Sequence, residues 1–406
     1  MTTKLLSELS TNISSGLTPL RSNPEFWENG SIPWLKTEQL GEKYIYETNE
    51  HISEAALEKT SIKLFPENSL SIAMYGEGKT RGNLSILKKA MATNQACCNV
   101  AIDPDKADFE YVYYFLKTQY DELRNLSSGV RKNLNSNDIK NYPIRLPENL
   151  DSQKKIANVL KVLDQKIELN NRINTELEAM AKTLFDYWFV QFDFPDTNGK
   201  PYKSSGGKMV YNPTLKREIP DGWSDNTLSQ IANITMGQSP EGSSYNEDGV
   251  GSIFYQGSTD FGWLFPTTRQ YTTEPGRMAK KGDILLSVRA PVGDMNIANT
   301  DCCIGRGLAA LNSKTDSDGF LFYVMKYFKQ IFNRRNSEGT TFGSITKNDL
   351  YSLTLAYPTS DLLKKYDGIV TNYNEMIFER SLENRELTKL RDWLLPMLMN
   401  GQVTVK

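Results

Sequence analysis

The chain has 406 residues, with 47 lysines and arginines against 49 aspartates and glutamates, so its net charge is −2. This length predicts two domains with connectors rather than one core. The balanced charge argues against a generally basic nucleic-acid coat protein, although a local basic face would not show in the total. The sequence has no apolar leader, no apolar run of the roughly 18 residues that a membrane span needs, and only four cysteines. We therefore expect a protein of the reducing cytoplasm.

An internal repeat is the main pattern in this sequence. Short matches recur in the same order about 210–220 positions apart. They are an apolar stretch ending in Gly and Pro, a glycine-rich basic loop after an apolar run, a cysteine pair, and a closing segment. The paired segments are 6–19 and 228–240, 71–82 and 284–293, Cys97–Cys98 and Cys302–Cys303, and 136–147 and 347–358. The repeat predicts two copies of one α/β (α+β) unit, with the cysteine pairs on the same core strand in both copies.

Strand and helix patterns alternate within each copy. The β-rich runs and the helical stretch that follows them are 71–75, 97–102 and 108–126 in the first copy, and 283–288, 302–311 and 319–335 in the second. Tyrosines and phenylalanines recur at three- to four-residue spacing in the last of these stretches. This spacing is more typical of core packing than of a platform for stacked bases.

Each copy is followed by a long helix of coiled-coil type. From Ile156 to Trp188, seam residues follow alternating steps of four and three, and a shift of about 210 positions gives a second seam from Tyr366 to Leu398. Asn170 and Asn174 interrupt the first seam, and polar seam residues fix register at a cost in stability. We expect the two helices to pack antiparallel as a rod of roughly 57 Å that separates the globular domains. The alternative is two unconnected surface helices.

These patterns define the expected domain plan. Globular domains are predicted at 1–150 and 219–358, and long helices at 151–193 and 359–399. The intervening segment 194–218 is rich in Gly, Pro, Ser and Lys, which predicts an exposed connector.

Signatures of catalysis are missing from the sequence. His51 is the single histidine, which excludes Ser-His-Asp, Cys-His and HNH-type sites. The cysteines are adjacent rather than spaced to face one metal ion. No GxxxxGK[ST] loop or cofactor-binding glycine fingerprint occurs. The sequences NPEF (23–26) and NPTL (212–215) lack the second proline of the tetrapeptide that amino-methyltransferases use. We expect no catalysis, no metal and no bound cofactor in the isolated chain.

Two pairs of repeated loops are the candidates for ligand contact. The first pair places cations among glycines, and arginine can read guanine bidentately or hold phosphate. Its candidate residues are Lys79, Thr80, Arg81, Arg289 and Arg306. The second pair, 32–40 and 253–261, is rich in polar side chains, and its glutamines can pair with adenine edges. Its candidates are Lys36, Thr37, Gln39, Gln256, Ser258 and Thr259. The alternative for each residue is an ordinary solvated turn.

Several strings give the chain a family resemblance. They are GLTP and GQSP, IPWLKTEQL, GDILLSVRAPVGDMNIA (282–298), CCIGRGLAAL, and QKKIANVLKVLDQKIELN (153–170). With these, almost the whole chain resembles the specificity subunit of type I restriction-modification enzymes. The first copy departs from the family pattern, because its loop YGEGKTRGN lacks the Arg-x-Pro of Arg289 and Pro291. Ligand contacts implied by the family resemblance can therefore be assigned more safely to residues of the second copy than to residues of the first.

The resemblance implies a non-catalytic DNA-binding subunit. Each globular domain would be a target recognition domain that reads one half of a split DNA sequence. The two helices would set the spacing and dock two modification subunits, with restriction subunits outside them. Those partners would bring S-adenosylmethionine for adenine N6 methylation, and ATP with Mg²⁺ for translocation and cleavage. Candidate docking residues on the helices are Leu163, Ile167, Trp188, Ile377, Leu387 and Trp393.

Two other functions are compatible with the residues alone. The chain could be the recognition part of a self-contained restriction-methyltransferase, which a methylation assay on pure protein would reveal. It could also be a coiled-coil scaffold that binds proteins and ignores DNA sequence. The target motif itself does not follow from the sequence, because loops vary freely on one scaffold.

Overall fold

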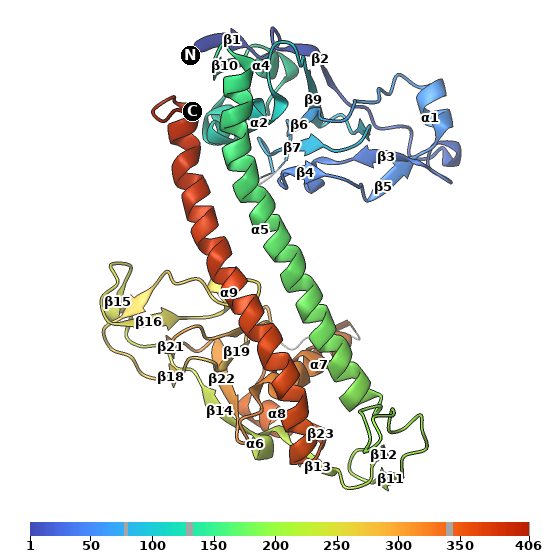
Figure 1. Cartoon of the computed structure of the whole chain (residues 1–406), viewed down its shortest axis with the longest axis vertical. Helices are drawn as coiled ribbons and strands as arrows, with labels where there is room; N and C mark the ends of the chain where they lie inside the picture. The colour runs from blue at the N-terminus through green and yellow to red at the C-terminus, as the bar shows by residue number, and fades with distance from the viewer. Residues whose placement is uncertain (77–79, 127–132, 338–343, 406) are drawn as a thin grey trace. The chain divides into compact units, whose positions relative to one another are not determined.

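The computed structural model describes residues 1–76, 80–126, 133–337 and 344–405 (Figure 1). The chain forms two compact units: unit 1 is Met1–Glu168 with Asn384–Lys406, and unit 2 is Leu169–Glu383. Each unit combines a globular α/β part with a length of both long helices. The predicted fold class, with two repeated α/β parts and two long helices, is confirmed. No helix in the described ranges combines the length and the apolar character needed to cross a bilayer.

Unit 1 is built on two sheets and a strand pair. The five-stranded sheet has the order β2 (Ser10–Ser15), β9 (Cys97–Ile102), β6 (Leu70–Ala73), β7 (Leu84–Leu87) and β4 (Tyr44–Ile45). The three-stranded sheet has the order β5 (Glu50–Ile52), β3 (Ile32–Leu35) and β8 (Ala92–Thr93). β1 (Thr2–Leu5) pairs with β10 (Pro143–Leu146). The helical elements are η1 (Pro24–Phe26), η2 (Thr37–Gln39), α1 (Glu54–Lys59), α2 (Phe109–Thr118), α3 (Tyr120–Asn125) and α4 (Ser136–Lys140).

The core of unit 1 lies between the five-stranded sheet and α2. Strands β6 and β7 are buried along their whole length, including Ser71 and Ser85. Asp108 caps the N-terminus of helix α2, because its side chain accepts the N–H of Tyr111 at 2.9 Å. Its Tyr111 and Leu116 side chains are fully buried in this core. This packed core therefore supports the loops at the ends of the strands.

Unit 2 repeats the plan with different strand lengths. One sheet has the order β14 (Ala232–Met236), β22 (Leu308–Ser313), β19 (Ile284–Ser287) and β20 (Met295–Ile297). The other has the order β15 (Tyr245–Asn246), β17 (Tyr271–Thr272), β16 (Ser252–Tyr255), β21 (Cys302–Ile304) and β18 (Met278–Ala279). β13 (Ser224–Thr227) pairs with β23 (Thr354–Tyr357). The helical elements are α6 (Leu228–Ile231), η4 (Gly242–Ser244), η5 (Ser258–Asp260), α7 (Asp318–Ser337) and α8 (Lys347–Tyr351).

Backbone hydrogen bonds give the structural register of the repeat. Gly16 N–H donates to the Cys97 carbonyl at 3.1 Å in unit 1, and Gly237 N–H donates to the Leu308 carbonyl at 2.9 Å in unit 2. Strands β2, β9 and β6 therefore correspond to β14, β22 and β19. The parallel pair β3–β8 corresponds to β16–β21. The glycines of GLTP and GQSP occupy the same place in the two units.

This register corrects the expectation for the cysteines. Cys97 opens β9, whose counterpart in unit 2 is β22 and begins at Leu308. Cys303 lies instead on β21, opposite Phe254, where unit 1 has Ala92 opposite Trp34. The two pairs thus lie on non-equivalent strands, and their similar spacing in the sequence is a coincidence. All four thiols are buried, and burial raises the pKa of Cys97 to about 12, so this side chain packs as a small apolar group.

The long helices are α5 (Leu150–Phe185), extended by a π-helical turn η3 (Asp186–Val190), and α9 (Ser360–Met399). They run antiparallel within each unit. In unit 1, Asp164 on α5 accepts from Arg391 on α9 at 3.1 Å. In unit 2, Asn170 donates to Glu383 at 2.7 Å, so one polar residue of the seam is paired across the helices. Every predicted seam residue is buried or half-buried.

The segment 194–218 is more structured than a flexible connector. Phe194 stacks on Tyr202, with ring centroids 4.6 Å apart, and on Trp223 at 5.4 Å. A hairpin of β11 (Met209–Asn212) and β12 (Arg217–Pro220) follows. The segment is exposed over much of its length, and these aromatic residues anchor it.

Candidate nucleic-acid interface

Four polar residues of unit 2 lie close to the ends of its strands. Gln256, Arg289 and Arg306 were predicted from the sequence, and Ser239 was not. Val288 N–H, just after β19, donates to the Gly307 carbonyl at 2.9 Å, and Gly305 N–H donates to the Tyr255 carbonyl at the end of β16 at 2.8 Å. The turn 305–307 therefore lies beside both strand ends. We call the set Ser239, Gln256, Arg289 and Arg306 the recognition edge of unit 2.

Ser239 connects two loops of this edge. Gln256 Nε2 donates to Ser239 Oγ at 2.8 Å, and the Ser239 hydroxyl lies 3.0 Å from Gln256 Oε1. The backbone N–H of Arg306 also donates to Ser239 Oγ, at 3.3 Å. Gly305 permits this packing, because a Cβ there would lie 2.6 Å from Gln256 Oε1. The loops are thus held together by side-chain contacts.

The two arginines of the edge are exposed. Over the residues that the structure describes, neither Arg289 nor Arg306 forms an ion pair with a carboxylate. Arg269, by contrast, binds Asp260 of η5 through Nε at 2.8 Å. Ser258 and Thr259 lie in η5 itself, with Thr259 exposed. Guanidinium groups without an internal partner can bind phosphate or the O6 and N7 acceptors of guanine.

Unit 1 has an equivalent set at the same strand ends. Met74 N–H donates to the Ala96 carbonyl at 2.8 Å, and Asn94 N–H donates to the Leu35 carbonyl at 2.9 Å. These bonds match those of Val288 and Gly305 in unit 2. The recognition edge of unit 1 is accordingly Thr18, Lys36, Tyr75 and Gln95, with Tyr75 opening the loop predicted to bind ligand.

The predicted residues of unit 1 differ in their freedom to bind a ligand. Lys36 pairs with Glu38 at 2.8 Å and Glu50 at 2.7 Å, and these two carboxylates raise its pKa. Gln39 accepts the backbone N–H of Asn49 at 3.2 Å. Thr37 opens η2 and is half-buried, as are Thr80 and Arg81 of the basic loop. Lys79 lies outside the described residues.

Sequence reasoning missed Thr18, Gln95 and Ser239. The two hydroxyl residues stand in GLTP and GQSP, the matching strings that mark the repeat in the sequence. Thr18 Oγ1 donates to Gln95 Oε1 across 77 positions of the chain, so no local pattern could have identified Gln95. The recurrent hydroxyl before proline was the one signal available.

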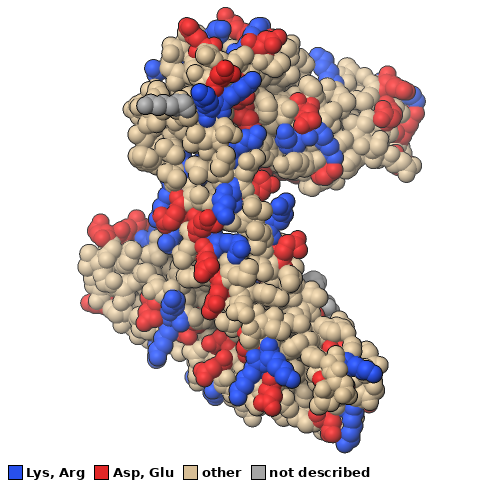
Figure 2. Space-filling model, in the orientation of Figure 1, with Lys and Arg blue, Asp and Glu red and all other residues tan. Residues whose placement is uncertain are grey.

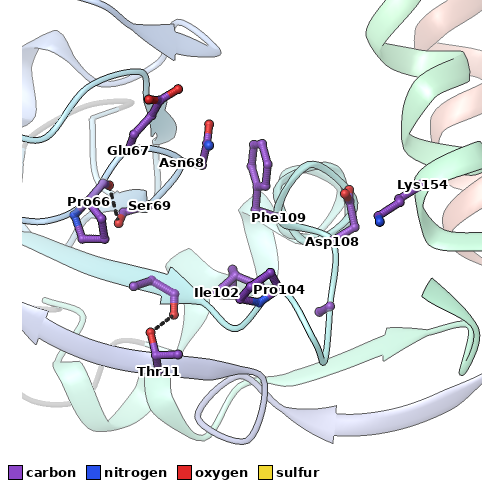
Figure 3. Close-up of a pocket in the computed structure, with 12 residues that line it drawn as sticks. Thr11, Pro66, Glu67, Asn68, Ser69, Ile102, Pro104, Asp108, Phe109 and Lys154 are labelled. Carbon is purple, nitrogen blue, oxygen red and sulfur yellow. Dashed lines mark hydrogen bonds between the residues drawn. The ribbon is translucent and has the colours of Figure 1, made fainter. Parts of the chain in front are cut away.

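Unit 1 also contains a separate hollow (Figure 3). It has a volume of about 470 Å³ and is lined by Thr11, Ser69, Ile102, Asp108 and Lys154 among others. Thr11 is near the start of β2, Ser69 precedes β6 and Ile102 ends β9. The recognition edge lies at the opposite ends of these three strands, so the hollow does not belong to it.

The candidate docking residues differ in how deeply their side chains are buried. Trp188 packs in the core of unit 2, 6.0 Å from the Tyr366 ring, and Ile377 is buried in the same core. Their side chains therefore stabilise unit 2 and do not face a partner. Leu163, Ile167 and Leu387 are half-buried seam residues, whereas Trp393 is 60% exposed.

Comparison with known proteins is consistent with this architecture. The family model for the type I restriction modification DNA specificity domain matches residues 2–179 and 220–369. The MjaIX specificity subunit of Methanocaldococcus jannaschii is 27% identical over 97% of this chain and 91% of its own length. The HindI specificity subunit of Haemophilus influenzae is 23% identical over 68% of this chain and 72% of its own.

A solved structure shows the same fold. The S subunit of a type I restriction-modification system from M. genitalium matches with a TM-score of 0.64 and 20% identity, over 98% of this chain and 95% of that chain. The relatives are named specificity subunits, not methyltransferases or nucleases. Because the family model covers both repeats, the chain belongs to the family of type I restriction-modification DNA specificity subunits.

Proposed function

We propose that the recognition edge of each unit contacts one half of a bipartite DNA sequence. The observation that carries this proposal is the recurrence of polar and basic loop residues at the same strand ends of both units. Backbone phosphate contacts would orient each unit, and side chains of the edge would read bases in the major groove. The gap between the two half-sites would remain unread.

The long helices are proposed to dock two modification subunits, with restriction subunits outside them. Exposed apolar residues recur at seven-residue intervals on each helix, as a helix-packing face requires. In unit 1 they are Val162, Leu390 and, three residues on, Trp393; in unit 2 they are Leu169, Met180, Tyr187, Ile369 and Met376. We call them the exposed stripe. On the face in Figure 2, basic and acidic side chains are interspersed along the helices, which favours a mixed-charge partner surface over a purely basic or acidic one.

The chemistry would belong to the partners. They would supply S-adenosylmethionine for adenine N6 methylation, and ATP with Mg²⁺ for translocation and cleavage, in the cytoplasm where host DNA is accessible. Across the described ranges, no group of three His, Cys, Asp or Glu residues is placed to hold a metal ion. In this proposal, the chain contributes the sequence reading and the scaffold.

Mapping methylated adenines in host DNA tests the proposal directly. Cells with this gene should carry one bipartite motif that disappears when the gene is deleted. A deletion that leaves every methylated motif in place would contradict the proposed function.

Arg306→Ala should relax specificity at one position of one half-site. A guanidinium that reads guanine bidentately contributes about 1–3 kcal/mol of discrimination, and Arg306 sits between glycines that let the backbone approach DNA. Competition binding with duplexes mutated at each position measures this. Arg269→Ala is the matched control, because Arg269 is engaged by Asp260. A uniform loss for all sequences with a shallower salt dependence would instead identify Arg306 as a phosphate contact.

A further inference from the structure

One hydroxyl occupies the same place in both units and holds a glutamine in each. Thr18 follows Gly16 by two residues, and Ser239 follows Gly237 by two residues. Each glycine donates its N–H to the first residue of the neighbouring strand, β9 or β22. These equivalent backbone hydrogen bonds therefore place Thr18 and Ser239 at the same position in the two units.

The glutamine held by this hydroxyl comes from a different loop in each unit. In unit 1, Thr18 Oγ1 donates to Oε1 of Gln95, in the turn before β9. In unit 2, Ser239 Oγ bonds the carboxamide of Gln256, in the loop after β16, at 2.8–3.0 Å. The position of Gln95 is taken in unit 2 by Arg306, and that of Gln256 is taken in unit 1 by Lys36. Each unit thus has one glutamine carboxamide held by a hydroxyl, but the glutamine occupies a different position of the repeat in each unit.

The chemistry of an oriented carboxamide points to adenine. A glutamine side chain offers one acceptor and one donor side by side, which match the N6 amino group and N7 of adenine in the major groove. The Thr18 bond uses one lone pair of Gln95 Oε1 and leaves its second lone pair and both Nε2 hydrogens available. Ser239 Oγ contacts both amide atoms of Gln256, which leaves one Oε1 lone pair and one Nε2 hydrogen available there. Gln95 and Gln256 are both exposed, so DNA can reach them. Fixing the rotamer in advance reduces the entropy lost on binding.

We propose that Gln95 and Gln256 are the adenine-reading side chains of units 1 and 2, and that Thr18 and Ser239 are their positioning residues. The proposal rests on the proposed function of the two recognition edges. It replaces Gln39 by Gln95 in unit 1, because Gln95 is exposed and is held by the hydroxyl that corresponds to Ser239, whereas Gln39 is half-buried and bonds the backbone N–H of Asn49. It also assigns different loops of the two units to the same type of base.

The test uses the chain assembled with its modification subunits and duplexes carrying its mapped target. Each adenine of the target is replaced in turn by 7-deazaadenine, which pairs normally but lacks the N7 acceptor. The unmodified complex should lose affinity by about 5- to 150-fold at one adenine per half-site, the range given by a good bidentate contact. Gln95→Ala should be insensitive to the replacement at its own adenine and remain sensitive in the other half-site. Gln256→Ala should show the reverse.

Control variants separate reading from positioning and from folding. Gln39→Ala should keep the sensitivity of the unmodified complex at every adenine. Thr18→Ala should reduce the sensitivity that Gln95 confers, and Thr18→Ser should restore it. The inference is overturned if Gln95→Ala keeps every sensitivity, or if no replacement in the first half-site affects the unmodified complex. A complex that binds all DNA sequences equally would instead refute the proposed function itself.

Discussion

Exchanging residues 219–358 for the matching segment of a relative should replace one half of the methylated motif and leave the other half unchanged. The exchanged segment contains the complete recognition edge of unit 2, from Ser239 to Arg306, and the strand pair β13–β23 that closes its globular part. All contacts described for this edge are made within unit 2. Base-reading energies of separate, independent sites add, so the half-site read by unit 1 should be insensitive to the exchange.

Sequencing of methylated DNA from cells that carry the exchanged chain measures the result. The reciprocal exchange of residues 1–147 is the matched control and should alter only the other half of the motif. If either exchange changed both half-sites, or changed neither, the two edges would not be independent readers. A complex that fails to assemble would be recognised separately, since it would leave no methylated motif at all.

The repeat and its closing segments were predictable because they are local. The helices α4 and α8 each begin with a capping box, at Asn135 with Asp138 and at Thr346 with Asp349. This motif is visible within four residues. The coiled-coil seams were equally visible, because their period extends along one continuous helix. The matching of these closing segments and the helical seams therefore needed only patterns that lie within one continuous stretch of sequence.

The strand register was not predictable in this way. The sequence match aligns Leu35 with Gln256, whereas the strand pairing within each unit makes Leu35 equivalent to Tyr255 and Lys36 equivalent to Gln256. A slip of one residue turns a strand's side chains to the other face. Short apolar runs match equally well at neighbouring registers, and the extra residue, Gly257, lies in a loop. The same ambiguity produced the incorrect pairing of the cysteines.

Burial of the helix ends also depends on tertiary structure. Trp188 continues the seam of α5, and its position near the helix end suggested a partner contact. In unit 2 the rings of Phe189 and Tyr366 lie 6.2 Å and 6.0 Å from it and enclose it. A helical period identifies the apolar face of a helix but does not identify which protein covers that face.

Two adjacent substitutions on α9 should separate folding of the chain from docking of its partners. Ile377 is 1% exposed and packs in the core of unit 2, whereas Met376 is 38% exposed and belongs to the exposed stripe. Ile377→Asp places an unpaired carboxylate in an apolar core and removes apolar contacts. We expect it to lower the free energy of unfolding by on the order of 4 kcal/mol, a large share of a typical domain's total.

Met376→Asp should leave the folded chain intact and weaken assembly. A surface substitution usually changes stability by less than about 0.5 kcal/mol, but a carboxylate in an apolar helix-packing face must be desolvated without a partner when a modification subunit docks. Urea unfolding of the isolated chain measures the first effect, and co-purification of modification subunits measures the second. Thr371→Asp, at an exposed position on a different face of α9, is the matched control and should affect neither. If Met376→Asp folded normally and assembled as well as this control, the exposed stripe in unit 2 would not be the docking surface.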